Sequence, residues 1–404
     1  MRFLNKNLGE IAFILNGYAF KSNEYTTEGI RIIRITNVQK GKIQDSNPQY
    51  VSLSRQEEFS NYLLREGDLL ISLTGNVGRV GLLTKEFLPA ALNQRVGCVR
   101  VADIKTLDIN YLYQYLNTDY FESLCINNSN GIAQLNLSTK WLEQVQIPLP
   151  PLPEQIAIAN LLSKAEALIT KRKESLALLD AYLKSTFLEL FGDPVRNEKG
   201  WEVKRLGDVI VDLIAGASYG GEMTGSLADD ELGVIKVSAV TWGYFNPREF
   251  KAIKKSRITK TVIHPLKNDL LFSRANTKEL VGATCIVDKD YRQLFLPDKI
   301  WKIILDSNKM QNVYFHHLML VPRFKDTLTR DATGTSGSML NISMEKLRGL
   351  YCPVPPLEFQ KQFAAVVEKV EALKEKYLMS LGELENLYGS LSQRAFRGEL
   401  GVGG

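Results

Sequence analysis

The feature that most constrains this chain is an internal duplication. Segments from its first half return in the same order in its second half, offset by about 200 residues throughout. The matched segments are 8–11 with 206–209, 33–38 with 235–240, 67–72 with 268–273, Val80-Gly81 with Val281-Gly282, 135–138 with 340–343, and 147–152 with 352–357. Because the order is kept over the whole length, we expect the two halves to fold alike.

Each half begins with about 150 residues of mixed character. Short β-branched runs such as IRIIRITNV, DLLISL and RVGCVRV are separated by Gly, Asn and Asp, which are typical of turns between strands. A helix is expected later, over DINYLYQYLNTDYFESL. GNVGRVG, at 75–81, is expected to be a loop between two strands whose backbone N–H groups, with Arg79, could hold a phosphate oxygen. This part of each half is predicted to be a mixed α/β lobe.

Each half ends in a long helix with a seven-residue apolar repeat, which is typical of a coiled coil. The first helix follows the proline-rich segment IPLPPLPEQ, and residues 155–191 contain no Gly or Pro. The predicted seam positions are Leu162, Ile169, Leu176, Leu183 and Leu190 in the first helix, and Phe363, Val370, Tyr377, Leu384 and Leu391 in the second. A helix of about 36 residues is roughly 54 Å long, which is long for a helix that covers only its own lobe.

These features predict an α+β protein in which two mixed α/β lobes, in a pseudo-two-fold arrangement, are joined by a long antiparallel two-helix coiled coil. The alternative is that each helix packs back on its own lobe.

Composition is that of a globular protein, with 45% hydrophobic and 24% charged residues. No apolar run approaches the roughly 18 residues of a membrane span, and the N-terminus does not resemble a signal peptide. The four cysteines lie far apart without a CxxC pair, which fits a reducing compartment. We therefore expect buried thiols, a cytoplasmic protein and no membrane partner.

Positive charge is concentrated in the second half. Residues 201–355 hold 22 Lys and Arg against 17 Asp and Glu, whereas the other segments are close to neutral. Within this region Lys251, Lys254, Lys255, Arg257 and Lys260 fall within ten residues. Such a run is either a solvated face or a surface that contacts phosphate.

Motifs for catalysis are weak in this sequence. The adjacent His316 and His317 lack the spacing of a zinc-binding HExxH motif and are better explained by a packed helical surface. Asn47-Pro48-Gln49-Tyr50 is similar to the Asn-Pro-Pro-Tyr motif of adenine methyltransferases, but the second proline is replaced and an ordinary turn explains it better. We expect neither a catalytic site, a metal site nor a bound cofactor in this chain.

The duplicated plan, IPLPPLPEQ, STFLELFGDPVRNEKGWEVKRLGDV and the ending LSQRAFRGEL resemble the specificity subunits of type I restriction-modification systems. The resemblance runs along the whole chain. One junction departs from it, since Phe359 stands where the first copy has Glu154, which leaves Gln360 to match Gln155.

The resemblance implies a DNA-reading subunit that is not itself a catalyst. Residues 1–152 and 197–357 would be target-recognition domains, each reading one half of an asymmetric bipartite site in double-stranded DNA. Residues 153–196 and 358–404 would be helical spacers that act as a ruler. Members bind two adenine-N6 methyltransferase subunits, which use S-adenosylmethionine. Two motor-nuclease subunits, which use ATP with Mg, can join the complex.

Base and phosphate contacts need Arg, Lys, Asn, Gln and hydroxyl side chains. The DNA-binding candidates of the first lobe are Lys21, Arg34, Asn37, Asn76, Arg79, Asn93, Gln94 and Arg95. Those of the second lobe are Lys236, Lys251, Lys254, Lys255, Arg274, Asn276, Thr277 and Lys278. For each residue the alternative is a strand-end hydrogen bond or a solvated charge. Two polar loops, 127–131 and 332–338, are either further backbone contacts or plain surface loops.

Two other functions stay open at this stage. A stand-alone DNA methyltransferase or nuclease would bind S-adenosylmethionine itself or show a carboxylate-metal cluster. A structural adaptor that only recruits proteins through its heptads would show no salt-dependent affinity for duplex DNA.

Overall fold

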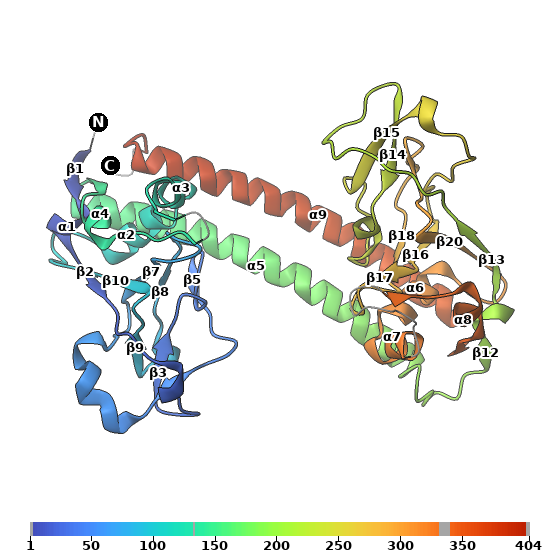
Figure 1. The fold of residues 1–404 in the computed structure, drawn as a ribbon, viewed down its shortest axis with the longest axis horizontal. Helices are drawn as coiled ribbons and strands as arrows, with labels where there is room; N and C mark the ends of the chain where they lie inside the picture. The colour runs from blue at the N-terminus through green and yellow to red at the C-terminus, as the bar shows by residue number, and fades with distance from the viewer. Residues whose placement is uncertain (1–2, 132–133, 331–339, 401–404) are drawn as a thin grey trace. The chain divides into compact units, whose positions relative to one another are not determined.

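The computed structural model describes residues 3–131, 134–330 and 340–400. The chain divides into two compact units, Met1–Glu174 with Leu378–Gly404, and Ser175–Tyr377 (Figure 1). Two helices of 40 residues each, α5 (Leu152–Phe191) and α9 (Leu357–Phe396), pass through both units. The part of each unit outside these helices is called its lobe. In the described part of the chain, no helix combines the length and apolar character that a membrane span requires.

The first lobe is built on a four-stranded sheet, β2-β10-β7-β8, and a three-stranded sheet, β6-β3-β9. Its strands are β1 (Leu4–Asn7), β2 (Ala12–Asn16), β3 (Ile30–Ile33), β4 (Val38–Gln39), β5 (Lys42–Ile43), β6 (Tyr50–Val51), β7 (Leu69–Ser72), β8 (Val80–Leu82), β9 (Ala90–Leu92), β10 (Val96–Val101) and β11 (Gln146–Leu149). Its helices are α1 (Leu8–Ile11), α2 (Ile109–Leu116), α3 (Asp119–Asn127) and α4 (Thr139–Glu143).

Strand β7 is buried on both faces, which explains its unbroken apolar sequence. Leu69 and Ile71 pack in one core with α2 and α5, while Leu70 packs in another with β3 and β9. The helix expected over residues 108–124 is interrupted. The Thr118 hydroxyl accepts a hydrogen bond from the backbone N–H of Phe121 at 3.1 Å and so starts α3 as a separate helix.

The second lobe repeats this plan with the sheets β13-β20-β16-β18 and β15-β14-β19. Its strands are β12 (Val203–Arg205), β13 (Ile210–Ala215), β14 (Glu231–Ile235), β15 (Phe250–Lys254), β16 (Leu270–Ser273), β17 (Ala275–Asn276), β18 (Thr284–Ile286), β19 (Leu294–Phe295), β20 (Ile300–Leu305), β21 (Leu340–Asn341) and β22 (Tyr351–Pro353). Its helices are α6 (Asn312–Leu320), α7 (Pro322–Thr329) and α8 (Met344–Gly349).

Strand register corrects one part of the predicted duplication. Ile71 of β7 pairs with Val80, whereas the equivalent Phe272 of β16 pairs with Thr284. The match of Val80-Gly81 with Val281-Gly282 is therefore wrong by three residues, because the loop after β16 is that much longer. The glycine equivalent to Gly282 is Gly78, since their N–H groups donate to Ser273 and Ser72 and both have positive φ, 77° and 81°.

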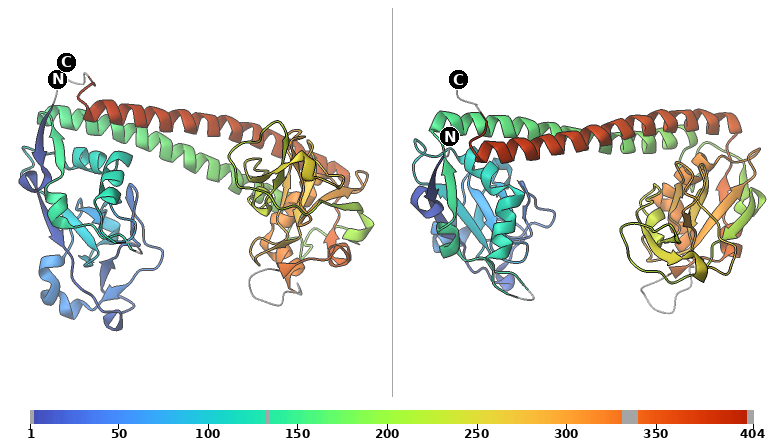
Figure 2. Two further views of the ribbon diagram at one scale, coloured as in Figure 1. Left: turned by 45° about the horizontal axis from the view of Figure 1, so that its top comes forward. Right: turned by 90° about the horizontal axis from the view of Figure 1, so that it is seen from above.

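Helices α5 and α9 pack antiparallel in each unit (Figure 2). In the first unit, Lys173 of α5 forms an ion pair with Glu385 of α9 at 2.8 Å. Nearer the start of α5, the later residues Leu391 and Ala395 of α9 join the core that holds Ile158 and Leu162. In the second unit, Lys374 of α9 forms an ion pair with Asp180 of α5 at 2.8 Å.

The predicted seam positions all face other parts of the protein. Leu162, Leu183, Phe363 and Val370 are buried, and the other six, Ile169, Leu176, Leu190, Tyr377, Leu384 and Leu391, are partly buried. Leu162 and Phe363 belong to the cores of the first and second lobes. The two arrangements posed as alternatives therefore coexist, because the start of each helix packs on its own lobe while it pairs with the end of the other helix.

A buried glutamine fixes the start of each long helix. Gln155 and Gln360 are both 0% exposed. Gln155 donates to the carbonyl oxygens of Pro150 and Thr106 and accepts from the N–H of Asp108, at 2.8 to 3.0 Å. Gln360 makes the equivalent three bonds to Pro355, Lys309 and Gln311, at 2.7 to 3.0 Å. This explains why glutamine persists at the second junction although Phe359 replaces the glutamate.

Candidate nucleic-acid interface

Several strands of the first lobe end at one edge. Asn16, the last residue of β2, lies opposite Gly97, and Ser72, the last residue of β7, lies opposite Val96 at the start of β10. The parallel strands β3 and β9 end side by side at Ile33 and Leu92. The loops that follow, 17–21, 34–37, 73–79 and 93–95, are called the first loop edge.

Backbone hydrogen bonds tie these loops together. The N–H of Asn93 donates to Ile33 O at 3.1 Å, that of Leu73 to Arg95 O at 3.0 Å, and that of Gln94 to Tyr18 O at 2.9 Å. All eight DNA-binding candidates of the first lobe lie in these four loops. Residues predicted from separate segments are therefore gathered at one surface.

Two of the eight candidates hold the loops in shape. Asn37 is buried, accepts from the N–H of Arg34 at 2.8 Å and donates to Gln44 O at 3.2 Å. Asn93 is buried and accepts from the N–H of Arg95 at 3.3 Å. Four others, Lys21, Asn76, Gln94 and Arg95, are exposed. The exposed four are free to face a ligand, while the asparagines position their neighbours.

Arg34 and Arg79 are partly buried and incompletely paired. Arg34 donates from one Nη to Asn47 O at 2.7 Å, and Arg79 donates to Gln39 Oε1 at 3.1 Å and lies 3.8 Å from a Glu122 oxygen. The Nε atom of each is buried without a hydrogen-bond partner among the described residues. A buried donor left unpaired is costly, so both guanidinium groups can still gain from an acceptor.

The second lobe forms an equivalent edge from the loops 216–221, 236–249, 274–283 and 296–299, called the second loop edge. Ser273 at the end of β16 lies opposite Ile300 at the start of β20. The N–H of Arg274 donates to Lys299 O at 3.0 Å, as Leu73 does to Arg95 in the first lobe. The same backbone construction thus presents loops in both units.

The cations of the second loop edge are more often paired. Lys236 forms an ion pair with Glu249 at 2.7 Å. Arg274 donates to Asp298 O at 2.9 Å and lies 3.9 Å from the carboxylate of that residue. Asn276 accepts from the N–H of Thr277 at 2.9 Å, and Thr277 and Lys278 are exposed.

The lysine run 251–255 is not gathered with the other candidates. Strand β15 runs antiparallel to β14, so that Phe250 lies opposite Ile235 and Lys254 lies opposite Glu231. Lys254 is thus about 13 Å along the strand from the end that adjoins Lys236. Lys255 donates to Asp229 O at 2.7 Å. Lys254 and Lys255 form a separate exposed surface of the second lobe, and Lys251 lies between it and the edge.

One polar loop adjoins the first loop edge. Asn130 exchanges two backbone hydrogen bonds with Asn136, at 2.8 and 2.9 Å, and the Thr74 hydroxyl donates to Asn136 Oδ1 at 3.1 Å. Residues 332–338, the predicted counterpart, lie outside the described residues.

The sequence analysis missed two residues that lie near these edges. Arg248 is exposed at the second loop edge, and Lys42 lines a cavity beside Arg34. The signal for Lys42 was present, because Lys40-Gly41-Lys42 has the glycine of a hairpin turn and Gly41 has φ of 78°. Arg248 carried no comparable signal.

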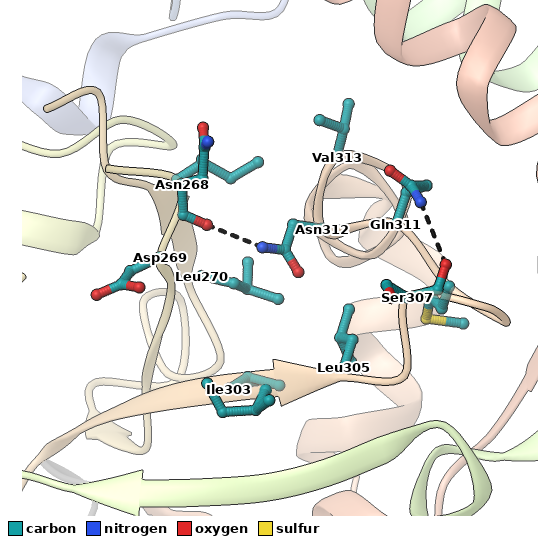
Figure 3. Close-up of a pocket in the computed structure, with 12 residues that line it drawn as sticks. Asn268, Asp269, Leu270, Ile303, Leu305, Ser307, Gln311, Asn312 and Val313 are labelled. Carbon is teal, nitrogen blue, oxygen red and sulfur yellow. Dashed lines mark hydrogen bonds between the residues drawn. The ribbon is translucent and has the colours of Figure 1, made fainter. Parts of the chain in front are cut away.

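A second cavity, of about 430 Å³, lies at the opposite end of the second lobe (Figure 3). It adjoins Leu270 at the start of β16 and Leu305 at the end of β20. Its Asn312 side chain donates to Asn268 O at 2.8 Å. The cavity is lined by apolar side chains, an aspartate and amides, two of which already donate to carbonyl oxygens, and none of the described residues that line it is a cation. It is therefore a poor place for nucleic acid, and it lies at the other end of the strands from the loop edge.

Two of the three histidines, His316 and His317, and the four cysteines are withdrawn from solvent. Burial lowers the pKa of His316 to about 3 and that of His317 to about 4, so both are neutral at pH 7. Burial raises the pKa of the Cys125 and Cys352 thiols to about 12. The expected packed helical surface at His316 and His317 is confirmed.

The sequence pattern of the type I restriction modification DNA specificity domain matches residues 3–178 and 198–379. The type I restriction enzyme EcoBI specificity subunit of Escherichia coli is 23% identical over 98% of this chain and 86% of that protein. The EcoAI specificity subunit of Escherichia coli is 35% identical over 40% of this chain and 27% of that protein. The crystal structure of a type-I restriction-modification S subunit from M. genitalium has the same fold, with a TM-score of 0.57, 14% identity and coverage of 98% of this chain and 96% of that one.

Proposed function

Because the chain belongs to the type I restriction modification DNA specificity family, we propose that it reads a bipartite DNA site, one half with each loop edge, for partner enzyme subunits. The observation that carries this proposal is the repeated construction of the two edges. Each places polar side chains at the ends of buried strands, where a rigid scaffold positions them and the loops are free to vary. One unit serves one half-site.

The chemistry is assigned to partners. We infer that methyltransferase subunits, using S-adenosylmethionine, methylate adenine at N6, and that motor-nuclease subunits, using ATP with Mg, join the same complex. Relatives such as the EcoBI protein carry the name of specificity subunits, which supports a non-catalytic role. The neutral buried histidines and the buried thiols of this chain are poorly placed to act as base or nucleophile.

The long helices offer a surface for those partners. Leu168, Leu178, Tyr182, Leu378, Met379 and Leu387 are large apolar side chains on α5 and α9 that are at least half exposed. Large apolar side chains that are exposed in such numbers are typical of a protein contact. On this proposal, the helices both receive the partner subunits and set the spacer between the half-sites.

Genome-wide mapping of methylated adenine tests the proposal. Cells that contain the partner subunits are compared with and without this chain. We expect a bipartite motif that disappears when the chain is removed. A motif that persists would assign specificity to another subunit, and the absence of any salt-dependent duplex binding by the complex would favour a structural adaptor.

A further inference from the structure

A cavity of about 410 Å³ opens beside the first loop edge, between the loop after β3 and the segment that leads to β6. Every side chain that lines it is polar. The residues that matter here are Arg34, Thr36, Lys42, Gln44, Asp45 and Asn47. Such a lining excludes an apolar ligand and favours a charged or strongly hydrogen-bonding group.

The exposed charge in this cavity is positive. The side chain of Asp45, its one carboxylate, is 1% exposed and is held by Arg31 at 2.9 Å. Arg34 uses one nitrogen on Asn47 O, and its buried Nε has no hydrogen-bond partner among the described residues. Lys42 is exposed and has no carboxylate partner in the described part of the chain. An acceptor with negative charge would satisfy both cations.

The shape of the cavity identifies which part of DNA fits. Bases in a duplex are recessed in the grooves, so protein groups that read them must protrude. A concave site instead receives a group that projects from the duplex, and the projecting anionic group is the phosphate. Arginine, lysine and hydroxyl donors are the side chains that contact phosphate oxygens most often.

We propose that this cavity holds one phosphodiester group of the DNA strand at the first half-site, with Arg34, Lys42 and Thr36 as its donors. The inference rests on the proposed DNA-reading function and adds a specific phosphate contact, called the phosphate anchor, at the first half-site. Arg34 directly follows β3, and Gln39 of the adjoining hairpin accepts from Arg79 of the first loop edge. The bound phosphate therefore fixes the register of the loop that carries Asn76 and Arg79.

The equivalent place in the second unit is already neutralised. Lys236 corresponds to Arg34, and its ammonium lies 2.7 Å from Glu249, which also accepts from Ser238 at 2.6 Å. The carboxylate lowers the gain from a phosphate because the two anions compete for one lysine. The first unit, in the less basic half of the sequence, thus has the better phosphate anchor at its loop edge.

The test uses the complex with methyltransferase subunits and a duplex that contains the full site. We expect Lys42→Gln and Thr36→Ala to weaken specific and non-specific binding by the same factor. Lys42→Gln should also reduce the slope of log K against log salt by about 0.9, the value for one phosphate. Lys105→Gln is the matched control, because Lys105 is an exposed lysine of the same lobe beyond the far end of β10. It should leave the slope unchanged.

A scan of uncharged methylphosphonate linkages through the duplex gives a second readout. The wild-type complex should lose affinity at one linkage of the first half-site, and the Lys42→Gln complex should be insensitive there. An unchanged slope, or a change in the preferred base, would overturn the cavity assignment. A wild-type complex that binds no duplex selectively would instead overturn the proposed function itself.

Discussion

The two units carry different side chains where each lobe meets the long helices, although equivalent hydrogen bonds to the main chain are kept there. Tyr111 and Tyr314 hold equivalent places, since their hydroxyls donate to Pro148 O and Pro353 O at 2.7 and 2.8 Å. The positions that follow are Tyr113 and Gln114 in the first unit and His316 and His317 in the second. One backbone frame thus carries two different layers of side chains.

In the first unit this layer is a hydrogen-bonded network. The Gln114 amide donates to Glu166 at 3.1 Å and accepts from the Tyr388 hydroxyl at 2.8 Å. The Tyr113 hydroxyl lies 3.0 Å from the same glutamate and 2.9 Å from Gly41 O. Both long helices and the β4-β5 hairpin are joined through these few groups.

In the second unit the layer is aromatic. The His317 ring lies 4.8 Å from that of Phe363 and its Nδ1 donates to Val313 O at 3.0 Å, while His316 Nδ1 lies 2.9 Å from the Thr284 hydroxyl. Hydrogen bonds to main-chain groups thus keep the same frame in both units, while the side chains packed on it form a polar network in one unit and an aromatic layer in the other.

Removing the buried glutamine at the start of each long helix should have the largest effect on stability, and the effect should be equal in both units. Gln155→Leu and Gln360→Leu each leave three main-chain groups without this hydrogen-bond partner, one in a buried bond and two in partly buried bonds. The expected cost is about 3 kcal/mol in the free energy of unfolding. Urea unfolding followed by hydrogen exchange measures this unit by unit. Glu154→Ala is the control and should cost little, because the Glu154 side chain forms no hydrogen bond within the part of the chain that the structure describes. Markedly unequal costs would mean that the two junctions are not equivalent.

Acid should separate the units. Burial lowers the pKa of His316 to about 3 and that of His317 to about 4, below the ordinary histidine pKa of about 6.5, so the unfolded chain binds more protons between these limits. Above pH 6.5 the imidazoles are neutral in both states and cost no stability. As pH falls toward the folded pKa values, only the unfolded chain binds protons, so the free energy of unfolding decreases. At pH 5 the second unit should lose about 2 kcal/mol for each imidazole.

Hydrogen exchange at pH 7 and pH 5 checks this expectation. All three histidines of the chain lie in the second unit, so the first unit serves as an internal control. His316→Tyr with His317→Gln installs the residues of the first unit and should remove most of the difference. Equal acid sensitivity in the two units would assign the effect to carboxylates instead.

A smaller effect is expected from Tyr388→Phe, which removes the hydroxyl that joins α9 to Gln114. We expect the first unit to lose about 1 kcal/mol, the usual net value of one hydrogen bond. Leu183 precedes Phe191 by as many residues as Tyr388 precedes Phe396, and it is buried and apolar. Leu183→Met is therefore a control in the second unit. A loss from Tyr388→Phe that equals a glutamine substitution would show that the network, rather than the junction, holds the helix.

The smallest expected effect comes from surface charge, and it is compared with the effect of a residue expected to contact a base. Lys251, Lys254 and Lys255 changed together to Ala should weaken binding to all sequences and flatten the salt slope by up to roughly one unit per lost phosphate contact. Arg95→Ala, at the first loop edge, should instead relax the preference for one base. Binding to a library of duplexes at several salt concentrations separates these outcomes. A changed base preference in the triple variant would place the lysines in direct readout.

Much of the architecture could be predicted from sequence, because heptads, prolines and an ordered duplication are local patterns. The split between α2 and α3 was missed, since it depends on one capping threonine. Contacts between residues that are distant in the sequence could not be predicted either. Nothing near Lys236 in sequence reveals that Glu249 neutralises it, and nothing near Asn93 reveals that it is buried. The first-lobe candidates therefore lie together in four loops, whereas Lys254 and Lys255 lie apart from the other candidates, and the role of each residue depends on contacts made only after folding.

The second unit is one continuous stretch, Ser175–Tyr377, whereas the first needs residues from both sides of it. During synthesis the second unit can thus complete its core soon after Tyr377 leaves the ribosome. The core of the first unit stays incomplete until Leu391 and Ala395 have been synthesised, because both residues pack in it. Truncation before Leu378 should accordingly expose the first lobe to proteases and spare the second. The middle of the sequence is therefore expected to fold before its two ends, which together complete the first unit.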